Sequence, residues 1–251
     1  MITDPLFYLA AVPAVFLFGI AKGGFGGGLG VAAVPLMALV VSPVQAAGIL
    51  LPLLCLMDLF GLWVYREHLN VRLQKSLLPG AVLGIAIGTA LFGYMSTAMI
   101  RIILGVIAIT FTLNHWFGLS EWIAHHTRRA GWPAAAGSGM VAGFTSFIAH
   151  AGGPPINMYL LTQGMSRTLF VGTTVLFFAV VNYTKLIPYA WLGQLDATNL
   201  WTSAVLAPLA PAGIAAGVWL HRRVSDKLFF RIAYVMLFIV GLRLLYDGVS
   251  G

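Results

Sequence analysis

Charge is what this sequence lacks most. Only 8% of its 251 residues are charged, whereas a soluble globular domain usually has about 25%. Acidic residues are the scarcest, with 7 Asp and Glu against 14 Lys and Arg, while hydrophobic residues make up 60% of the chain. This composition excludes an ordinary soluble domain and indicates a protein whose main solvent is the lipid bilayer.

Cysteine and catalytic patterns are almost absent as well. The single cysteine, Cys55, excludes an internal disulfide and a cysteine-based metal cluster. No HExxH motif, acid pair or Ser-His-Asp arrangement occurs in the apolar segments, so we expect no enzyme, no metal and no cofactor. The basic residues lie mainly in short loops, which is typical of membrane topology rather than of nucleic-acid binding.

Long apolar runs dominate what is present. A membrane-spanning helix needs roughly 20 apolar residues, and the runs here are continuous rather than alternating as in barrel strands. The sequence therefore predicts an all-α polytopic membrane protein, placed as a multi-pass protein in a bacterial inner membrane. Hydropathy divides it into ten segments, at about 6–21, 31–42, 44–65, 76–95, 98–118, 132–149, 154–164, 168–190, 198–220 and 229–248.

Matching residues at a nearly constant offset indicate an internal duplication. The matches pair Pro79, Gly84, Gly88 and Gly27-Gly28 with Pro208, Gly213, Gly217 and Gly152-Gly153. We interpret residues 1–119 as a first transmembrane repeat, 120–131 as a cytoplasmic linker and 132–251 as a second repeat. Each repeat then has five hydrophobic segments, opening with a short helix, a glycine-rich break and a half-helix.

Loop charges predict that the two repeats are inverted. The loop at Arg66–Lys75, the central linker and the loop at His221–Lys227 are all basic, so the positive-inside rule places all three in the cytoplasm. The equivalent of the first loop is Leu192–Asn199, whose only charge is Asp196, and we expect it outside, together with both termini. Equivalent loops on opposite sides define an inverted repeat, which suits alternating access in transporters.

Glycine-rich breaks precede the short segments of the two halves. Residues 19–30 contain seven glycines, and because glycine inside a helix costs about 1 kcal/mol relative to alanine, we expect this run to be unwound. The second break lies at 146–155. The half-helix after each break presents an N-terminus that attracts anions, so the breaks predict a substrate site near the bilayer midplane. Close helix packing is the other use of membrane glycines, and we expect it for Gly80, Gly84 and Gly88.

The GGFGGG string at 23–28, the short segment with Pro35 and the degenerate copy at 146–155 resemble the TauE/SafE sulfite exporter family. The resemblance covers essentially the whole chain. It implies a secondary transporter, acting as an exporter, of a small sulfur-containing anion such as sulfite or an organosulfonate. The alternatives are an anion channel and a transporter of a different small organic anion.

Polar residues within the apolar segments are the candidates for the anion site, because such residues are costly in a membrane. Asp58 and His150 are also candidates for proton coupling, although Asp58 equally suits pairing with a lysine. The expected partners are a small anion and the bilayer, and a homo-oligomer is left open. The predicted substrate-binding residues are Lys22, Gly23, Gly24, Gly26, Gly27, Gly28, Ser146, His150, Gly152, Gly153, Asn157, Asn182 and Lys185.

Overall fold

The computed structural model describes residues 1–24, 28–119, 122, 131–220 and 226–250. Within these ranges the secondary structure is helical, as predicted, and we find no strand there. The elements are α1 (Pro5–Gly24), the 3-10 helix η1 (Gly28–Ala32), α2 (Ala33–Met37), α3 (Pro43–Tyr65), α4 (Val71–Phe92), α5 (Thr97–Phe117), α7 (Trp132–Ala149), α8 (Gly153–Leu161), α9 (Arg167–Trp191), α10 (Ala197–Leu206), α11 (Leu209–Leu220) and α12 (Asp226–Ser250).

Several of these helices have the length and composition of membrane spans. Five described helices, α1, α3, α4, α5 and α9, are long and apolar enough to cross a bilayer, and α10 with α11 makes a sixth if the bent pair is one span. Their outer faces carry large exposed apolar side chains such as Leu83, Ile187 and Trp191, which suits contact with lipid. The chain is a multi-pass helical membrane protein.

The predicted apolar segment at 198–220 consists of two helices, α10 and α11, which meet at a bend of 43°. Pro208 lies at the junction of α10 and α11, where its missing N–H and its ring disfavour a continuous helix. The matching residue of the first half, Pro79, lies inside α4, which continues past it. The sequence pattern therefore does not distinguish a proline that ends a helix from one that is accommodated.

The prediction that residues 19–30 are unwound is wrong for 19–24, because α1 remains helical to Gly24. Its glycines pack against α11, where a Cβ on Gly19 would lie 2.8 Å from the Gly213 Cα. Close packing of this kind compensates for the low helix propensity of glycine. The half-helix predicted at 31–42 is also shorter than expected, since it consists of η1 and the five-residue α2.

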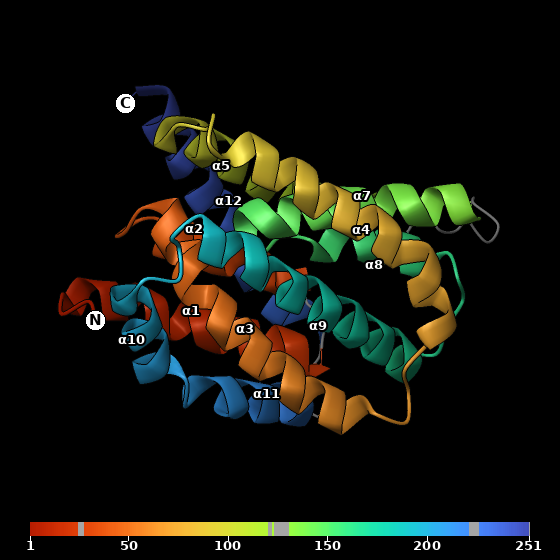
Figure 1. Cartoon of the computed structure of the whole chain (residues 1–251). Coiled ribbons are helices and arrows are strands. Elements are labelled where there is room, and N and C mark those ends of the chain that lie inside the picture. Colours follow the sequence, from red (N-terminus) through yellow and green to blue (C-terminus); the bar gives the residue numbers. More distant parts are fainter. Residues whose placement is uncertain (25–27, 120–121, 123–130, 221–225, 251) are drawn as a thin grey trace.

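Two long helix pairs join the first half of the chain to the second (Figure 1). Helix α4 packs along α7, and α1 packs along α11. A Cβ on Gly84 would collide with the Met140 carbonyl of α7, and a Cβ on Gly80 would collide with the Ala136 carbonyl. The predicted packing role of Gly80, Gly84 and Gly88 is therefore confirmed, the last of these lying against Phe147.

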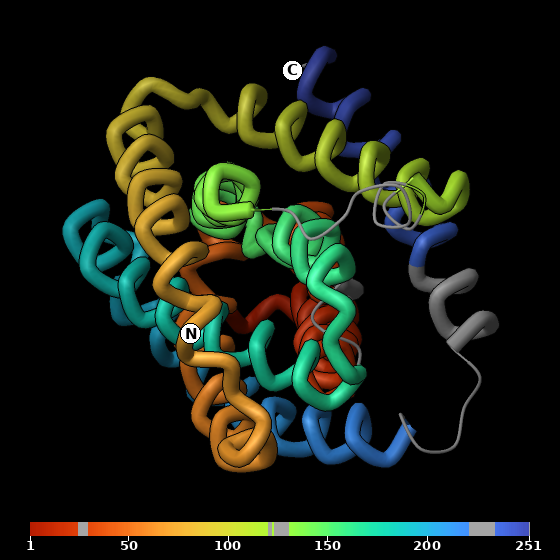
Figure 2. Tube along the Cα trace, turned by 90° about the vertical axis from the view of Figure 1, so that its right-hand side faces the viewer, coloured from red at the N-terminus to blue at the C-terminus, as the bar shows by residue number. Residues whose placement is uncertain are grey.

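The remaining long helices pair in the same way across the halves. Helix α3 packs along α9, and α5 packs along α12. Figure 2 shows α5 and α12 crossing at one side of the molecule, outside the bundle that contains the other helices. In Figure 1 the α3–α4 loop (66–70) and the α9–α10 loop (192–196) lie at opposite ends of the molecule, with both chain ends near the latter. Most of the predicted linker, and the loop at 221–225, lie outside the described residues.

Candidate functional site

The second break is a short non-helical segment between α7 and α8. His150 follows the last residue of α7 in a left-handed conformation, with φ of 51°, and its N–H donates to the Ser146 carbonyl at 3.0 Å. This is a common way to end a helix, although glycine usually holds the position. Helix α8 then begins at Gly153, with Pro154 and Pro155 in its first turn, where proline is well tolerated.

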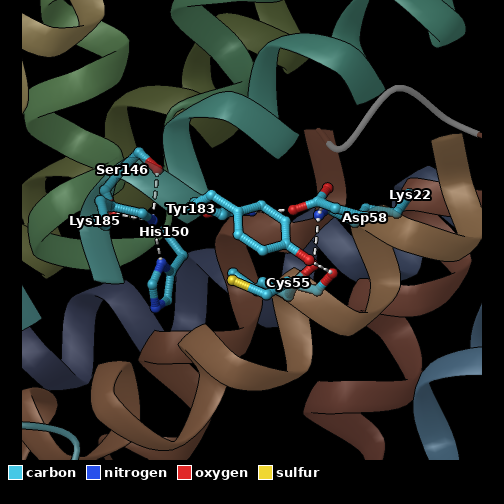
Figure 3. Close-up of polar contacts among 9 residues, drawn as sticks. Lys22, Cys55, Asp58, Ser146, His150, Tyr183 and Lys185 are labelled. Carbon is cyan, nitrogen blue, oxygen red and sulfur yellow. Dashed lines mark hydrogen bonds and ion pairs between the residues drawn. The ribbon is translucent and has the colours of Figure 1, made fainter. Parts of the chain in front are cut away.

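Lys185 of α9 reaches the end of α7 at this break. Its Nζ lies 3.0 Å from both the carbonyl oxygen and the Oγ of Ser146, and 2.8 Å from His150 Nδ1 (Figure 3). Lys185 is fully buried, and the other two residues are nearly so. A cation in the last turn of a helix is favoured by the helix dipole and by its free carbonyl groups.

The hydrogen-bond partners of His150 define its tautomer. Its Nε2 lies 2.9 Å from the Ala47 carbonyl of α3, and a carbonyl can only accept, so Nε2 carries the proton. Nδ1 is then the acceptor for the Lys185 ammonium. His150 therefore connects α3, α7 and α9 through its two ring nitrogens.

A second polar cluster lies beside the first one, on α1 and α3. The Lys22 ammonium forms an ion pair with Asp58 Oδ1 and also lies 3.3 Å from the Leu54 carbonyl. Asp58 Oδ2 accepts a hydrogen bond of 2.7 Å from the Asn182 amide of α9. All three polar side chains are buried. Figure 3 shows Lys22 and Asp58 on one side of Tyr183 and Cys55, and Lys185, Ser146 and His150 on the other.

The two clusters face a common small cavity. Its volume is about 10 Å³, which is close to the least space that holds one water molecule. Sulfite is larger than water, so the cavity has to widen before such an anion is held. It is lined by Phe18, Lys22, Leu54, Ser146, His150, Gly153, Phe178 and Asn182.

The structure thus brings together some of the predicted site residues and separates others. Lys22, Ser146, His150, Gly153 and Asn182 line the cavity, and Lys185 contacts two of them. The other predicted residues are placed as follows: Gly23 packs on α11, Gly24 ends α1, Gly28 begins η1, Gly152 packs on Phe178 and Ser146, Asn157 lies in α8 and is not among the residues that line the cavity, and Gly26 and Gly27 fall outside the described residues.

Sequence reasoning missed two tyrosines that bind the helix ends beside the breaks. The Tyr65 hydroxyl donates to the Gly23 carbonyl at 2.8 Å, and the Tyr189 hydroxyl donates to the Phe147 carbonyl at 2.6 Å. Both carbonyls lie in the last turn of their helices, where intrahelical donors run out. The two tyrosines are separated in the sequence by the same offset as Asp58 and Asn182, so aligning α3 with α9 would have found them.

Comparison with known proteins gives a family. The profile described as "Sulfite exporter TauE/SafE" matches residues 11–244. A protein from Cupriavidus necator named "Probable sulfite/organosulfonate exporter TauE" is 24% identical over 240 residues, covering 94% of this chain and 88% of its own length. None of the solved structures matches the chain.

Proposed function

The chain belongs to the sulfite exporter TauE/SafE family, and from that membership we propose that it exports a small sulfur-containing anion by secondary transport. Sulfite and organosulfonates, the compounds in the name of the Cupriavidus necator protein, are the proposed substrates. The observation that carries the site is the convergence of Lys22 and buried polar groups on one cavity beside the second break, with Lys185 hydrogen-bonded to two of the lining residues. Buried ionisable groups in membrane proteins commonly mark substrate pathways.

The proposed anion position is the cavity between Lys22, Ser146, His150, Asn182 and the first residue of α8. Pro154 and Pro155 have no N–H, so the start of α8 offers an oxyanion the N–H of Gly153 and the partial positive charge of the helix end. Helix α2 is too short to contribute in the same way. The proposed site is therefore asymmetric, with its helix end supplied by the second half.

We also propose that the two halves are inverted repeats. The opposite positions of the 66–70 and 192–196 loops support this arrangement. So does the exchange of partners, because α4 packs on α7 as α11 packs on α1. The paired tyrosine contacts, from α3 to the end of α1 and from α9 to the end of α7, support it at the level of single hydrogen bonds.

An unequal contact in the two halves supports alternating access. Helix α12 packs against η1 and α2. In the proposed repeat, α5 corresponds to α12, and α8 corresponds to the half-helix after the first break. The same contact is therefore expected between α5 and α8, but a pocket of about 590 Å³ lies between α5, α7 and α8 instead. Two inverted repeats that exchange these arrangements would open the site alternately to the two sides.

The closed cavity favours a carrier over a channel. A channel needs a continuous path, whereas the space between the two clusters holds about one water molecule. Anion export is also helped by a membrane potential that is negative inside, worth about 2.3 kcal/mol per charge per 100 mV. Proton coupling through Asp58 or His150 stays a prediction, measurable as a pH change that follows sulfite flux.

The test of transport is counterflow of labelled sulfite in proteoliposomes at clamped potential. We expect saturable counterflow that organosulfonates inhibit, and a loss of at least about tenfold in Lys185→Gln. The matched control is Lys75→Gln, an exposed lysine of α4, which should retain the wild-type rate. Flux without saturation or counterflow would favour the channel, and absence of flux for sulfite and sulfonates would overturn the substrate assignment.

The test of alternating access joins α5 to α8 across their pocket. Leu113 and Met158 both line it, and a cysteine at each, in a Cys55→Ala background, allows a reversible crosslink. We expect the crosslink to stop counterflow and its reduction to restore it. Single-cysteine variants treated with the same reagent are the controls, and full activity of the crosslinked double variant would contradict the proposed exchange.

A further inference from the structure

The buried charges of the described residues all belong to the proposed site. Among the described charged side chains only Lys22, Asp58 and Lys185 are buried, with exposed fractions of 6%, 1% and 0%. His150 joins them as a neutral ring, by the hydrogen-bond argument given above. Two ammonium groups against one carboxylate leave one positive charge uncompensated, and the environment screens it poorly because effective dielectric constants fall inside proteins.

The Lys22–Asp58 pair is compensated internally. One carboxylate oxygen takes the Lys22 ammonium and the other takes the Asn182 amide. Asp58 does not line the cavity, whereas Lys22 and Asn182 do. The carboxylate therefore lies behind the two groups that would face a bound anion. Its negative charge cancels most of the attraction that Lys22 alone would exert on that anion.

Lys185 has neutral partners. Its three contacts are the Ser146 carbonyl, the Ser146 hydroxyl and His150 Nδ1, which match the three N–H donors of an ammonium group. A buried ammonium without a counter-charge is costly, and an anion in the adjoining cavity would supply that charge. Both Ser146 and His150 line the cavity, so they separate the ammonium from the anion by one side chain.

We propose that the site selects singly charged oxyanions, such as hydrogensulfite or an alkanesulfonate, and that Asp58 is the residue that rejects dianions. This inference rests on the proposed function. One bound negative charge balances Lys185, whereas a second would lie near Asp58 with no cation left to match it. Replacing Asp58 with asparagine keeps the shape of the side chain, frees the charge of Lys22 and makes the site suitable for a dianion.

The test compares methanesulfonate with methanedisulfonate, which carry one and two charges, at equal ionic strength. Binding is read from the shift in thermal unfolding of the purified protein, and also from inhibition of labelled sulfite counterflow. Wild-type protein should bind the monoanion at least about tenfold more tightly, and Asp58→Asn should move the ratio toward the dianion by about tenfold or more. Glu67→Gln, which neutralises an exposed acid, should leave the ratio unchanged.

A double variant separates charge from local damage. Lys22→Gln with Asp58→Asn removes both charges of the pair and leaves Lys185 in place, so it should return the ratio to the wild-type value. A wild-type preference for the dianion, or a double variant that behaves like Asp58→Asn, would overturn the inference. The wild-type preference for the dianion would overturn the inference even if Asp58→Asn does not fold. Absence of wild-type sulfite counterflow would instead count against the proposed function.

Discussion

The ends of α1 and α7 are built alike. In each, a tyrosine from a later long helix donates its hydroxyl to a carbonyl in the last helical turn, Tyr65 to Gly23 and Tyr189 to Phe147. Each helix also packs through glycines against a helix of the other half. The framework that holds the two breaks is therefore the same in both halves.

The charges placed on this framework differ. In the first half Lys22 meets a carboxylate, Asp58, within one buried ion pair. In the second half the position that matches Asp58 is Asn182, and Lys185 meets neutral groups. The two helix ends therefore share their packing, whereas only the lysine of the second half lacks an acidic partner.

Replacing each of the two lysines in turn should give the largest difference in the free energy of unfolding between the two halves. Lys22→Met leaves Asp58 buried without its cation, which should lower the free energy of unfolding by about 3–5 kcal/mol. Lys185→Met leaves only neutral acceptors unpaired, so we expect a loss of about 1 kcal/mol or a small gain, with sulfite counterflow abolished. The measurement is unfolding of each purified variant in detergent.

The neutral double variant is the control for that comparison. Lys22→Gln with Asp58→Asn should recover most of the stability that Lys22→Met loses, because no charge is left unpaired. Equal destabilisation by Lys22→Met and Lys185→Met would show that the two lysines are held in equivalent ways, which contradicts the contrast drawn from their partners.

Much of the fold could be predicted from the sequence. Long apolar runs locate the ends of α3, α5 and α9 to within one residue and those of α4 to within five, because lipid imposes their length and composition. The spacing of Gly80, Gly84 and Gly88 on one helix face indicated close packing before the partner, α7, was known. The buried charges were equally visible, since a lysine or aspartate in an apolar run stands out.

The other features of the fold and of the candidate site depend on contacts between helices that are far apart in the sequence. Gly19 and Gly23 are helical because α11 approaches them closely, and no local pattern reveals that approach. The pairing of Lys22 with Asp58 rather than with an anion likewise depends on how α1 meets α3. The sequence also could not tell that Asn157 is not among the residues that line the cavity, because that depends on how α8 packs against the other helices.

Replacing matching glycines with alanine tests whether the two halves pack in equivalent ways. We expect a loss of stability between that of the lysine variants and that of the tyrosine variants. Gly84→Ala and its counterpart Gly213→Ala should each lower the free energy of unfolding by about 1–3 kcal/mol, since overpacking forces backbones apart. Gly84 should be the more costly, because its Cβ would collide with the Met140 carbonyl. Gly93→Ala, where a Cβ meets nothing within 4 Å, is the control and should be neutral or slightly stabilising, because alanine restricts the unfolded chain more than glycine does. A cost there as large as at Gly84 would contradict the packing explanation.

The smallest expected loss of stability is that from replacing the two tyrosines. This pair gives the most direct comparison of the ends of α1 and α7. Tyr65→Phe and Tyr189→Phe each remove one hydroxyl and leave one helix-end carbonyl without that donor, so each should lower the free energy of unfolding by about 1 kcal/mol. Tyr94→Phe, at a residue that is 84% exposed, should change little. Equal losses for the first two, measured by unfolding in detergent, are what a duplicated framework requires. A difference of more than about 1 kcal/mol would mean that the halves differ in their framework as well as in their charge, and the charge difference alone would no longer account for the proposed anion position beside the second break.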